Sequence, residues 1–194
     1  GTVELAKDLG LETTRVNRLL GTLADLGIAE RVAGRKYRAG GGLHVLAALA
    51  LAGSPLLRAS LGEIRDLDDL GLSVALGVRW RHQVCYLWHG KPGRAIEDGI
   101  AGHRLYPVAE SSLGVVLSTW ATDADLRARG WTHLRADSAN ASLAVPIGDP
   151  PYAALGVAGS IASAGAEALA RRLTAAAQRI ATRCTPLHGK GSDA

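Results

Sequence analysis

The sequence predicts an α+β chain with two parts. A small N-terminal unit has two helices and a β-hairpin, and a larger unit has an antiparallel sheet flanked by helices. Apolar residues recur at helical spacing in residues 2–10, 11–27 and 165–184, whereas residues 28–40 and 72–90 alternate in strand fashion. With 194 residues, of which 47 % are hydrophobic, the chain can bury one core of ordinary size and a smaller second one.

Two helices and a hairpin are expected at the start of the chain. Residues 2–10 form an amphipathic helix that Gly10 ends, because glycine readily adopts the left-handed conformation of a helix terminus. In the second helix, residues 11–27, five apolar side chains lie three or four positions apart and predict one stripe facing a core. They are Val16, Leu19, Leu20, Leu23 and Leu26. Residues 28–40 then form a hairpin that turns at Ala33-Gly34.

A Leu- and Ala-rich linking helix is expected in residues 40–53, followed by a second helix in residues 55–71. The remaining expected elements are strands at 72–80, 83–90, 141–148 and 152–161, a loop with one short strand at 93–107, and helices at 109–120, 122–130 and 165–184. We therefore predict three segments: a first domain in residues 1–39, a linking helix in residues 40–58, and a C-terminal domain in residues 59–194.

The order helix, glycine-containing turn, helix and hairpin is typical of a winged helix-turn-helix, in which the second helix enters the major groove of DNA. Such a helix must be apolar behind and polar in front. Thr14, Asn17 and Arg18 share the polar side, and Thr13 and Arg15 lie in the first turn, where backbone amides favour a phosphate. Because Arg and Asn can read base edges or hold phosphate, we predict that these five residues contact double-stranded DNA.

Positive charge is concentrated in the same region. Between Thr13 and Arg38 there are six basic residues and two acidic ones, and this excess of four equals the net charge of +4 of the whole chain. Arg35 and Lys36, beside the predicted hairpin tip, are expected to hold the flanking phosphates. The alternative is an ordinary solvated helix face beside a charged hairpin.

The cysteines and the apolar runs exclude a disulfide-bonded scaffold, a zinc protein and a membrane-spanning helix. The two cysteines, Cys85 and Cys184, make neither a disulfide framework nor a zinc site, so we expect no metal and no cofactor. The longest apolar run, residues 43–53, is too short to span a bilayer, and no signal peptide is visible, which favours the cytoplasm.

The chain contains no Met, and a helix-turn-helix usually packs on a preceding helix, so further sequence is expected upstream.

The sequence resembles the IclR family of bacterial transcription regulators in four stretches. These are VELAKDLGLETTRVNRLLGTLADLGIAER, KYRAGGGLHVLA, RLYPVAESSLGVVLST and SLAVPIGDPPYAALGVAGSIAS, in that order along the chain. The resemblance implies an N-terminal winged helix-turn-helix, a linking helix and a GAF-like effector-binding domain. It also implies a homodimer or a dimer of dimers that binds operator DNA and responds to a small metabolite, an organic acid or an aromatic compound. Repression and activation are both open.

The resemblance also implies which residues form the effector pocket. They are Leu105, Ser111, Ser112, Leu113, Ser142, Gly156 and Ala158. Members that hold small keto acids tend to have hydroxyls where this chain has Gly156 and Ala158, which implies a larger or less polar ligand here. The stretch of residues 118–131 is also much shorter than is usual in the family.

An enzyme is the competing interpretation. Ser111 and Ser112, with His103 and Asp98 nearby in the sequence, could supply a nucleophile and a base, but no nucleophile-elbow pattern surrounds the serines. Serines that open a helix more often cap it, so we expect no enzyme activity. A second alternative is a GAF-like sensor or enzyme-like module that acts through a protein partner. Trp88 could line an aromatic pocket, although a role in the core or a dimer interface is favoured in a chain without Phe.

Overall fold

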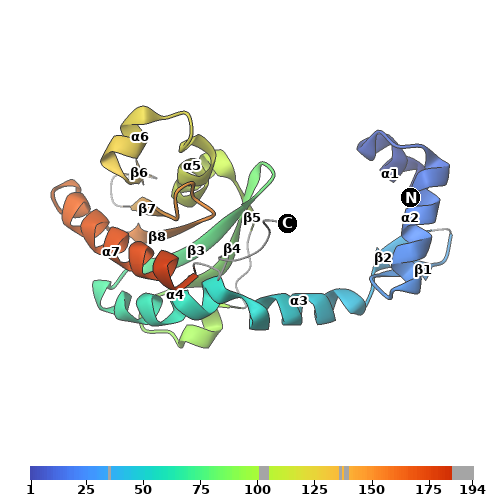
Figure 1. Cartoon of the computed structure of the whole chain (residues 1–194), viewed down its shortest axis with the longest axis horizontal. Helices are drawn as coiled ribbons and strands as arrows, with labels where there is room; N and C mark the ends of the chain where they lie inside the picture. The colour runs from blue at the N-terminus through green and yellow to red at the C-terminus, as the bar shows by residue number, and fades with distance from the viewer. Residues whose placement is uncertain (35, 101–104, 136, 138–139, 185–194) are drawn as a thin grey trace, which may run out of the picture. The chain divides into compact units, whose positions relative to one another are not determined.

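The computed structural model describes residues 1–34, 36–100, 105–135, 137 and 140–184. The chain divides into two compact units, Gly1–Ser54 and Pro55–Ala194, whose elements are labelled in Figure 1. The finer division into residues 1–39, 40–58 and 59–194 stays a prediction. The predicted class, helices combined with an antiparallel sheet, is confirmed.

The first unit contains the expected helices and hairpin. They are α1 (Thr2–Leu9), α2 (Thr13–Asp25), β1 (Ala29–Val32), β2 (Lys36–Ala39) and α3 (Gly42–Gly53). Gly10 has a φ of 63° and ends α1 as the sequence indicates, with its amide bonded to the carbonyl of Lys7. The start of α3 is held against the end of α2, because the amide of Gly42 donates to the carbonyl of Gly27 at 2.9 Å. A side chain at Gly42 would collide with that same carbonyl, which explains the glycine.

The apolar stripe of α2 is only partly buried. The expected burial is found for Val16 but not for three of the leucines, two of which, Leu19 and Leu23, a preceding helix is expected to cover. Val16 is 1 % exposed, whereas Leu19, Leu23 and Leu26 are 50 %, 37 % and 64 % exposed. The three helices and one short hairpin of this unit leave these leucines uncovered, as a unit of this size has little material to bury a core. The apolar helix α3 has no buried residue at all. Unit 1 therefore presents a large uncovered apolar surface.

The second unit is built on a six-stranded antiparallel sheet. In spatial order its strands are β5 (Leu105–Pro107), β4 (Gln83–Gly90), β3 (Ser73–Trp80), β8 (Ala153–Gly159), β7 (Ala141–Ile147) and β6 (Thr132–Arg135). The edge strand β6 was not expected, because its four residues lack a clear alternation of apolar and polar side chains. Its register, with His133 opposite Leu143, is visible only from the neighbouring strand.

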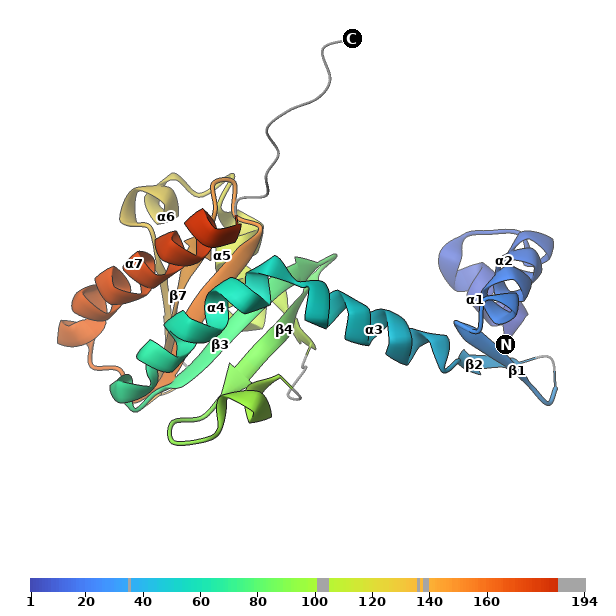
Figure 2. The ribbon, with the colours of Figure 1, turned by 60° about the horizontal axis from the view of Figure 1, so that its bottom comes forward.

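Helices cover the sheet of the second unit. The two long helices α4 (Pro55–Asp66) and α7 (Ala166–Cys184) lie side by side (Figure 2), and α7 packs against β7 and β8. The short helix α5 (Ser112–Thr119) packs against β3, β7 and β8, and α6 (Ala124–Arg129) follows it in the chain. Glu63 of α4 is 3 % exposed and pairs with Arg179 and Arg183 of α7, so the two helices are joined by buried charge as well as by apolar contacts. Residues 68–70, 96–99, 108–110 and 163–165 form short 3-10 turns.

No single described helix is long and apolar enough to cross a membrane. By length and composition alone, α3 and α4 would reach that size only if taken together across the break at Ser54. However, α4 buries Leu57, Glu63 and Ile64 in the core of the second unit, which accounts for its apolar face.

Candidate functional site

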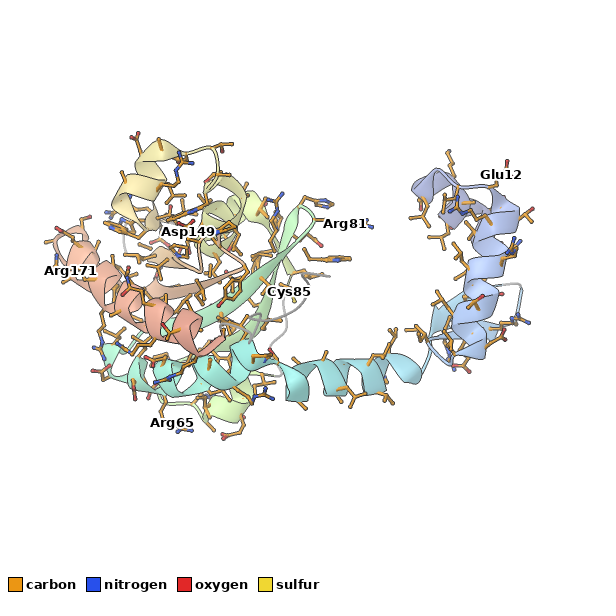
Figure 3. The ribbon with its side chains drawn as sticks, viewed as in Figure 1. Glu12, Arg65, Arg81, Cys85, Asp149 and Arg171 are labelled. Carbon is orange, nitrogen blue, oxygen red and sulfur yellow. The ribbon has the colours of Figure 1, made fainter. Side chains whose placement is uncertain are left out.

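The polar face of α2 points away from the core of the first unit. Thr13, Thr14, Arg15, Asn17 and Arg18 are all exposed, whereas Val16 between them is buried behind the helix. Figure 3 labels Glu12, the residue that begins this face at the N-terminus of α2. Within the described residues, no carboxylate lies within ion-pair distance of Arg15 or Arg18. This face is therefore free, on this unit, to contact an anion or a base edge.

Arg31 of β1 extends the same face. The sequence places this residue among the basic residues of the hairpin region, but does not predict its contact with α2. Helical spacing places Thr14, Asn17, Arg18 and Gly21 on one side of α2. The Nη2 atom of Arg31 lies 3.5 Å from the position that a Cβ atom on Gly21 would occupy, so this guanidinium rests against that side. The sequence contains both parts of this contact, a basic residue in the first hairpin strand and a glycine on the polar side of the helix. Only the fold shows that the two residues meet.

The described part of the hairpin carries two unpaired cations and one paired cation. Lys36 is exposed opposite Val32, and Arg35 lies outside the described residues. Arg38 donates from Nε to Glu30 across the strands at 2.9 Å. This hydrogen bond and the attraction of the opposite charges lower the pKa of Glu30 and raise that of Arg38. Arg31 and Lys36 are thus the described hairpin cations without an ion pair in unit 1.

A cavity of about 180 Å³ lies in the second unit, where β3, β4, β7 and β8 meet the start of α5. Five of the seven predicted pocket residues line it: Ser112, Leu113, Ser142, Gly156 and Ala158. Leu105 does not, since it is 51 % exposed on the edge strand β5. Ser111 lies just behind the wall. The lining residues that the sequence analysis did not name are Ser73, Ala75, Tyr86, His89, Tyr106, Glu110 and Val157.

Ser111 supports the cavity without lining it. Its side chain caps α5 by accepting a hydrogen bond from the amide of Gly114 at 3.3 Å. Its Oγ also lies 2.8 Å from the phenol oxygen of Tyr86, and either atom can donate. The serine next to it, Ser112, is 2 % exposed and faces the cavity. The two adjacent serines thus have different tasks, one holding the helix and the other lining the cavity.

Two glycines make room for Leu113 rather than for a ligand. A Cβ atom on Gly156 would lie 2.5 Å from Cδ1 of Leu113, and one on Gly77 would lie 2.9 Å from its Cδ2. The leucine at the start of α5 therefore packs against the bare backbones of β3 and β8. The extra ligand space expected from Gly156 is occupied by this side chain.

A bulge in β4 explains the aromatic wall that the sequence analysis missed. Gly77 pairs with Tyr86 and the next residue, Leu76, pairs with Trp88, so Leu87 is an extra residue in β4. The bulge reverses the usual alternation, and Tyr86 and His89, three positions apart, both line the cavity while Trp88 does not. The Tyr86 ring centroid lies 4.7 Å from that of Tyr106 and 5.6 Å from that of His89.

The cavity offers hydroxyls and aromatic rings but little positive charge. Among the described residues that line it, there is no Lys or Arg, and Glu110 is the one carboxylate. Burial raises the pKa of Tyr86, an effect that the hydrogen bond with Ser111 opposes and the nearby Tyr106 reinforces. The phenol therefore stays protonated at neutral pH and can donate or accept a hydrogen bond. Such a cavity is suited to a compact ring that carries hydroxyl groups.

The arrangement that would suggest an enzyme is not assembled in the described residues. Ser111 is engaged by its cap and by Tyr86, and His103 lies outside the described residues. Asp98 lies in the 3-10 turn of residues 96–99 and is absent from the cavity wall. In the part of the chain that the structure describes, no three His, Cys, Asp or Glu side chains are grouped to hold a metal ion.

No protein-family model matches the sequence, and no curated protein matches it either. Solved structures of IclR family regulators do match the fold over most of both chains. One from Brucella abortus is 20 % identical with a TM-score of 0.71, covering 94 % of this chain and 84 % of that one. A putative regulator from Silicibacter sp. TM1040 is 23 % identical with a TM-score of 0.69, covering 95 % and 88 %. An IclR homologue from Microbacterium hydrocarbonoxydans, complexed with 4-hydroxybenzoate, is 21 % identical with a TM-score of 0.61, covering 94 % and 90 %.

These neighbours are transcriptional regulators and not enzymes. The chain therefore has the fold of IclR family regulators, as the sequence resemblance implies.

Proposed function

We propose that this chain is a dimeric DNA-binding transcription regulator of the IclR type, whose operator binding responds to a small molecule held in the cavity of the second unit. The observation that carries the proposal is the face of α2. An exposed row of Thr, Asn and Arg side chains lies on a helix that follows a tight turn and precedes a basic hairpin. This is the layout of a winged helix-turn-helix, with α2 in the major groove and the hairpin against the flanking backbone.

On this proposal the residues of the face divide by task. Asn17 and Arg18 lie one turn into α2 and are the candidates for base edges, adenine and guanine respectively. Thr13, Thr14 and Arg15 at the start of the helix are the candidates for phosphate contacts, as are Arg31 and Lys36 of the hairpin. Arg35, outside the described residues, is assigned the same role from the sequence alone. Base contacts would supply sequence preference and phosphate contacts would supply affinity.

The proposed effector is a compact aromatic compound with hydroxyl or acid groups. The cavity of about 180 Å³ is small, its wall has two tyrosines and a histidine, and three serines supply hydrogen bonds. A structural neighbour is complexed with 4-hydroxybenzoate, a ligand of this kind. Because Leu113 takes up the room left by Gly156, this ligand is smaller than the one that the sequence alone implies. A coupling of about 1 to 3 kcal/mol between cavity and DNA would be typical of such a switch.

We propose a second copy of the chain as the cover of α3. This helix carries no charged residue, and Val45, Leu46 and Leu49 are 59 %, 50 % and 65 % exposed. A helix that is apolar all round is normally buried. Two copies joined through α3 would carry two copies of α2, and a dimer matches an operator with two half-sites about one helical turn apart. Such a regulator would act in the cytoplasm.

The test is selection of DNA from a random library, followed by binding assays with the selected site and a scrambled duplex. The unmodified protein should enrich a motif with two-fold symmetry. Arg18→Ala should weaken binding to the selected site far more than to the scrambled duplex, while Arg171→Ala, on the exposed face of α7, should change neither. Equal losses on both duplexes would make Arg18 a phosphate contact. Failure to enrich any motif would reject the proposal and favour a sensor that acts through a protein partner.

A further inference from the structure

A second hollow of about 290 Å³ lies in unit 2, between the end of α4 and the segment that follows β4. Three cations line it, Arg65 of α4, Lys91 and Arg94, together with two carboxylates, Asp68 and Glu97. Figure 3 labels Arg65 on α4. The first cavity and this hollow share none of their described lining residues. Their chemistry also differs, because the described wall of the first cavity contains no Lys or Arg.

The floor of the hollow is apolar and held in place. The indole of Trp88 is 5 % exposed, and its Nε1 donates to the carbonyl of Ile96 at 2.7 Å. Gly90 and Gly99 lie so close to the indole that neither could carry a side chain. Ile64 and Ile96 complete the apolar part of the lining. The bulge at Leu87 is the reason that Trp88 belongs to this hollow while Tyr86 and His89 belong to the cavity.

The segment after β4 is tied to the end of α4. The amide of Gly93 donates to a carboxylate oxygen of Asp68 at 3.2 Å. This oxygen is therefore already engaged by the backbone. Asp69, next to it, is already engaged by Arg172 of α7. Among the described residues, no carboxylate lies within ion-pair distance of Arg65, Lys91 or Arg94. Three unpaired cations therefore line one hollow. Together with the two carboxylates, they give its lining a formal charge of +1.

We propose that this hollow binds a small organic dianion, a phosphate monoester or a dicarboxylate, with its charged groups on Arg65, Lys91 and Arg94 and its carbon chain over Trp88. Three cations around an apolar floor match a short molecule with a doubly charged end or two charged ends. A bound dianion would join α4 to the segment after β4. The dianion would also lie over Trp88 of β4, the strand that supplies Tyr86 and His89 to the first cavity.

The test is isothermal titration calorimetry of the full chain at low salt with glycerol 3-phosphate and with succinate as probes, and with glycerol as the uncharged control. Either acid binding saturably, with glycerol silent, supports the proposal, and the tighter of the two identifies the chemical source. Arg65→Ala, Lys91→Ala and Arg94→Ala should each weaken binding by about tenfold or more, the usual effect of losing a charge-assisted hydrogen bond. All three side chains are exposed, so thermal unfolding should stay unchanged.

Two further variants make the outcome decisive. Glu97→Gln removes a negative charge from the hollow and should tighten binding of the dianion, whereas Arg171→Ala, which removes a cation outside the hollow, should leave binding unchanged. Absence of saturable binding with both probes, or equal weakening by Arg171→Ala, would overturn the proposal. Weaker binding in Glu97→Gln would do so as well. None of these variants lies in unit 1, so binding to the selected DNA tests the proposed function separately.

Discussion

The hydroxyl oxygens of Tyr86 and Ser111 lie 2.8 Å apart and join the sheet of the second unit to the first turn of α5. The same serine oxygen accepts a hydrogen bond from the amide of Gly114. One side chain therefore caps the helix and positions a phenol at the cavity wall. Because burial raises the pKa of Tyr86 while this hydrogen bond lowers it, the contact can be measured through the ionisation of the phenol.

We expect Ser111→Ala to raise the pKa of Tyr86 further, since the contribution that opposes burial is lost. Ultraviolet absorbance of phenolate during a pH titration measures this, with Tyr86→Phe assigning the signal. The raised pKa favours the neutral phenol in the folded state. Its contribution to stability is complete below the ordinary tyrosine value of 10.0 and is lost as the pH rises through the folded value. Ser118→Ala, in the same helix, should leave the pKa of Tyr86 unchanged. A lowered pKa in Ser111→Ala would contradict the assignment.

The hairpin should contribute to the electrostatics of DNA binding. Arg31→Ala and Lys36→Ala should each reduce the slope of log affinity against log salt by about 0.9 if each side chain neutralises one phosphate. Fluorescence anisotropy at several salt concentrations measures the slope. Arg171→Ala, in the second unit, should leave it unaltered. A slope that stays the same in both hairpin variants would remove the hairpin from the interface.

Filling the cavity should abolish the response to effector while DNA binding survives. Ala158 lines the cavity from an exposed position on β8, so Ala158→Leu can fill the space without entering the core. With 4-hydroxybenzoate as the probe, we expect affinity to fall by about tenfold or more. Ala158→Ser, which keeps the volume small, is the matched control and should bind. Unchanged affinity in Ala158→Leu would place the effector elsewhere.

The apolar helix α3 should determine the oligomeric state. Replacing Leu46 and Leu49 with Lys places two charges on the uncovered surface and should shift the protein from dimer to monomer, because burying unpaired charge is costly. Sedimentation velocity measures this. The control is His44→Lys, which adds a charge to the same helix where a polar side chain already stands. This variant should leave the dimer intact. A dimer that persists in the double Lys variant would locate the interface outside α3.

Gly156 should be required for the fold of the second unit rather than for ligand access. In Gly156→Ala, Cβ would lie 2.5 Å from Cδ1 of Leu113 and 2.9 Å from the carbonyl oxygen of Leu143. We expect a loss of about 1 to 3 kcal/mol in the free energy of unfolding, the usual effect of overpacking. Gly62→Ala in α4 has nothing within 4 Å and should instead add up to about 1 kcal/mol. Urea denaturation compares the two variants, and equal effects would contradict the packing of Leu113.

The chain order of helices and strands, except for the edge strand β6, follows from the sequence itself. Periodic apolar residues, the positive φ at Gly10 and Gly34, and the polar residues of α2 are local signals, and each depends on neighbours within about one or two turns. The same signals put Thr14, Asn17 and Arg18 on an exposed face. The resemblance added Ser112, Leu113, Ser142, Gly156 and Ala158, which are five of the twelve residues that line the cavity, and their role in effector binding stays a prediction.

Only the tertiary structure decided how distant segments meet. The pairing of β3 with β8 brings Ala75 opposite Gly156, and the bulge at Leu87 separates Tyr86 and His89 from Trp88. Neither can be seen locally, because a one-residue change of register moves side chains to the other face and leaves the composition unchanged. The contact of Arg31 with Gly21 and the packing of Leu113 against two glycines likewise join residues from different elements. Such contacts depend on the three-dimensional path of the backbone, which local patterns of residues do not specify.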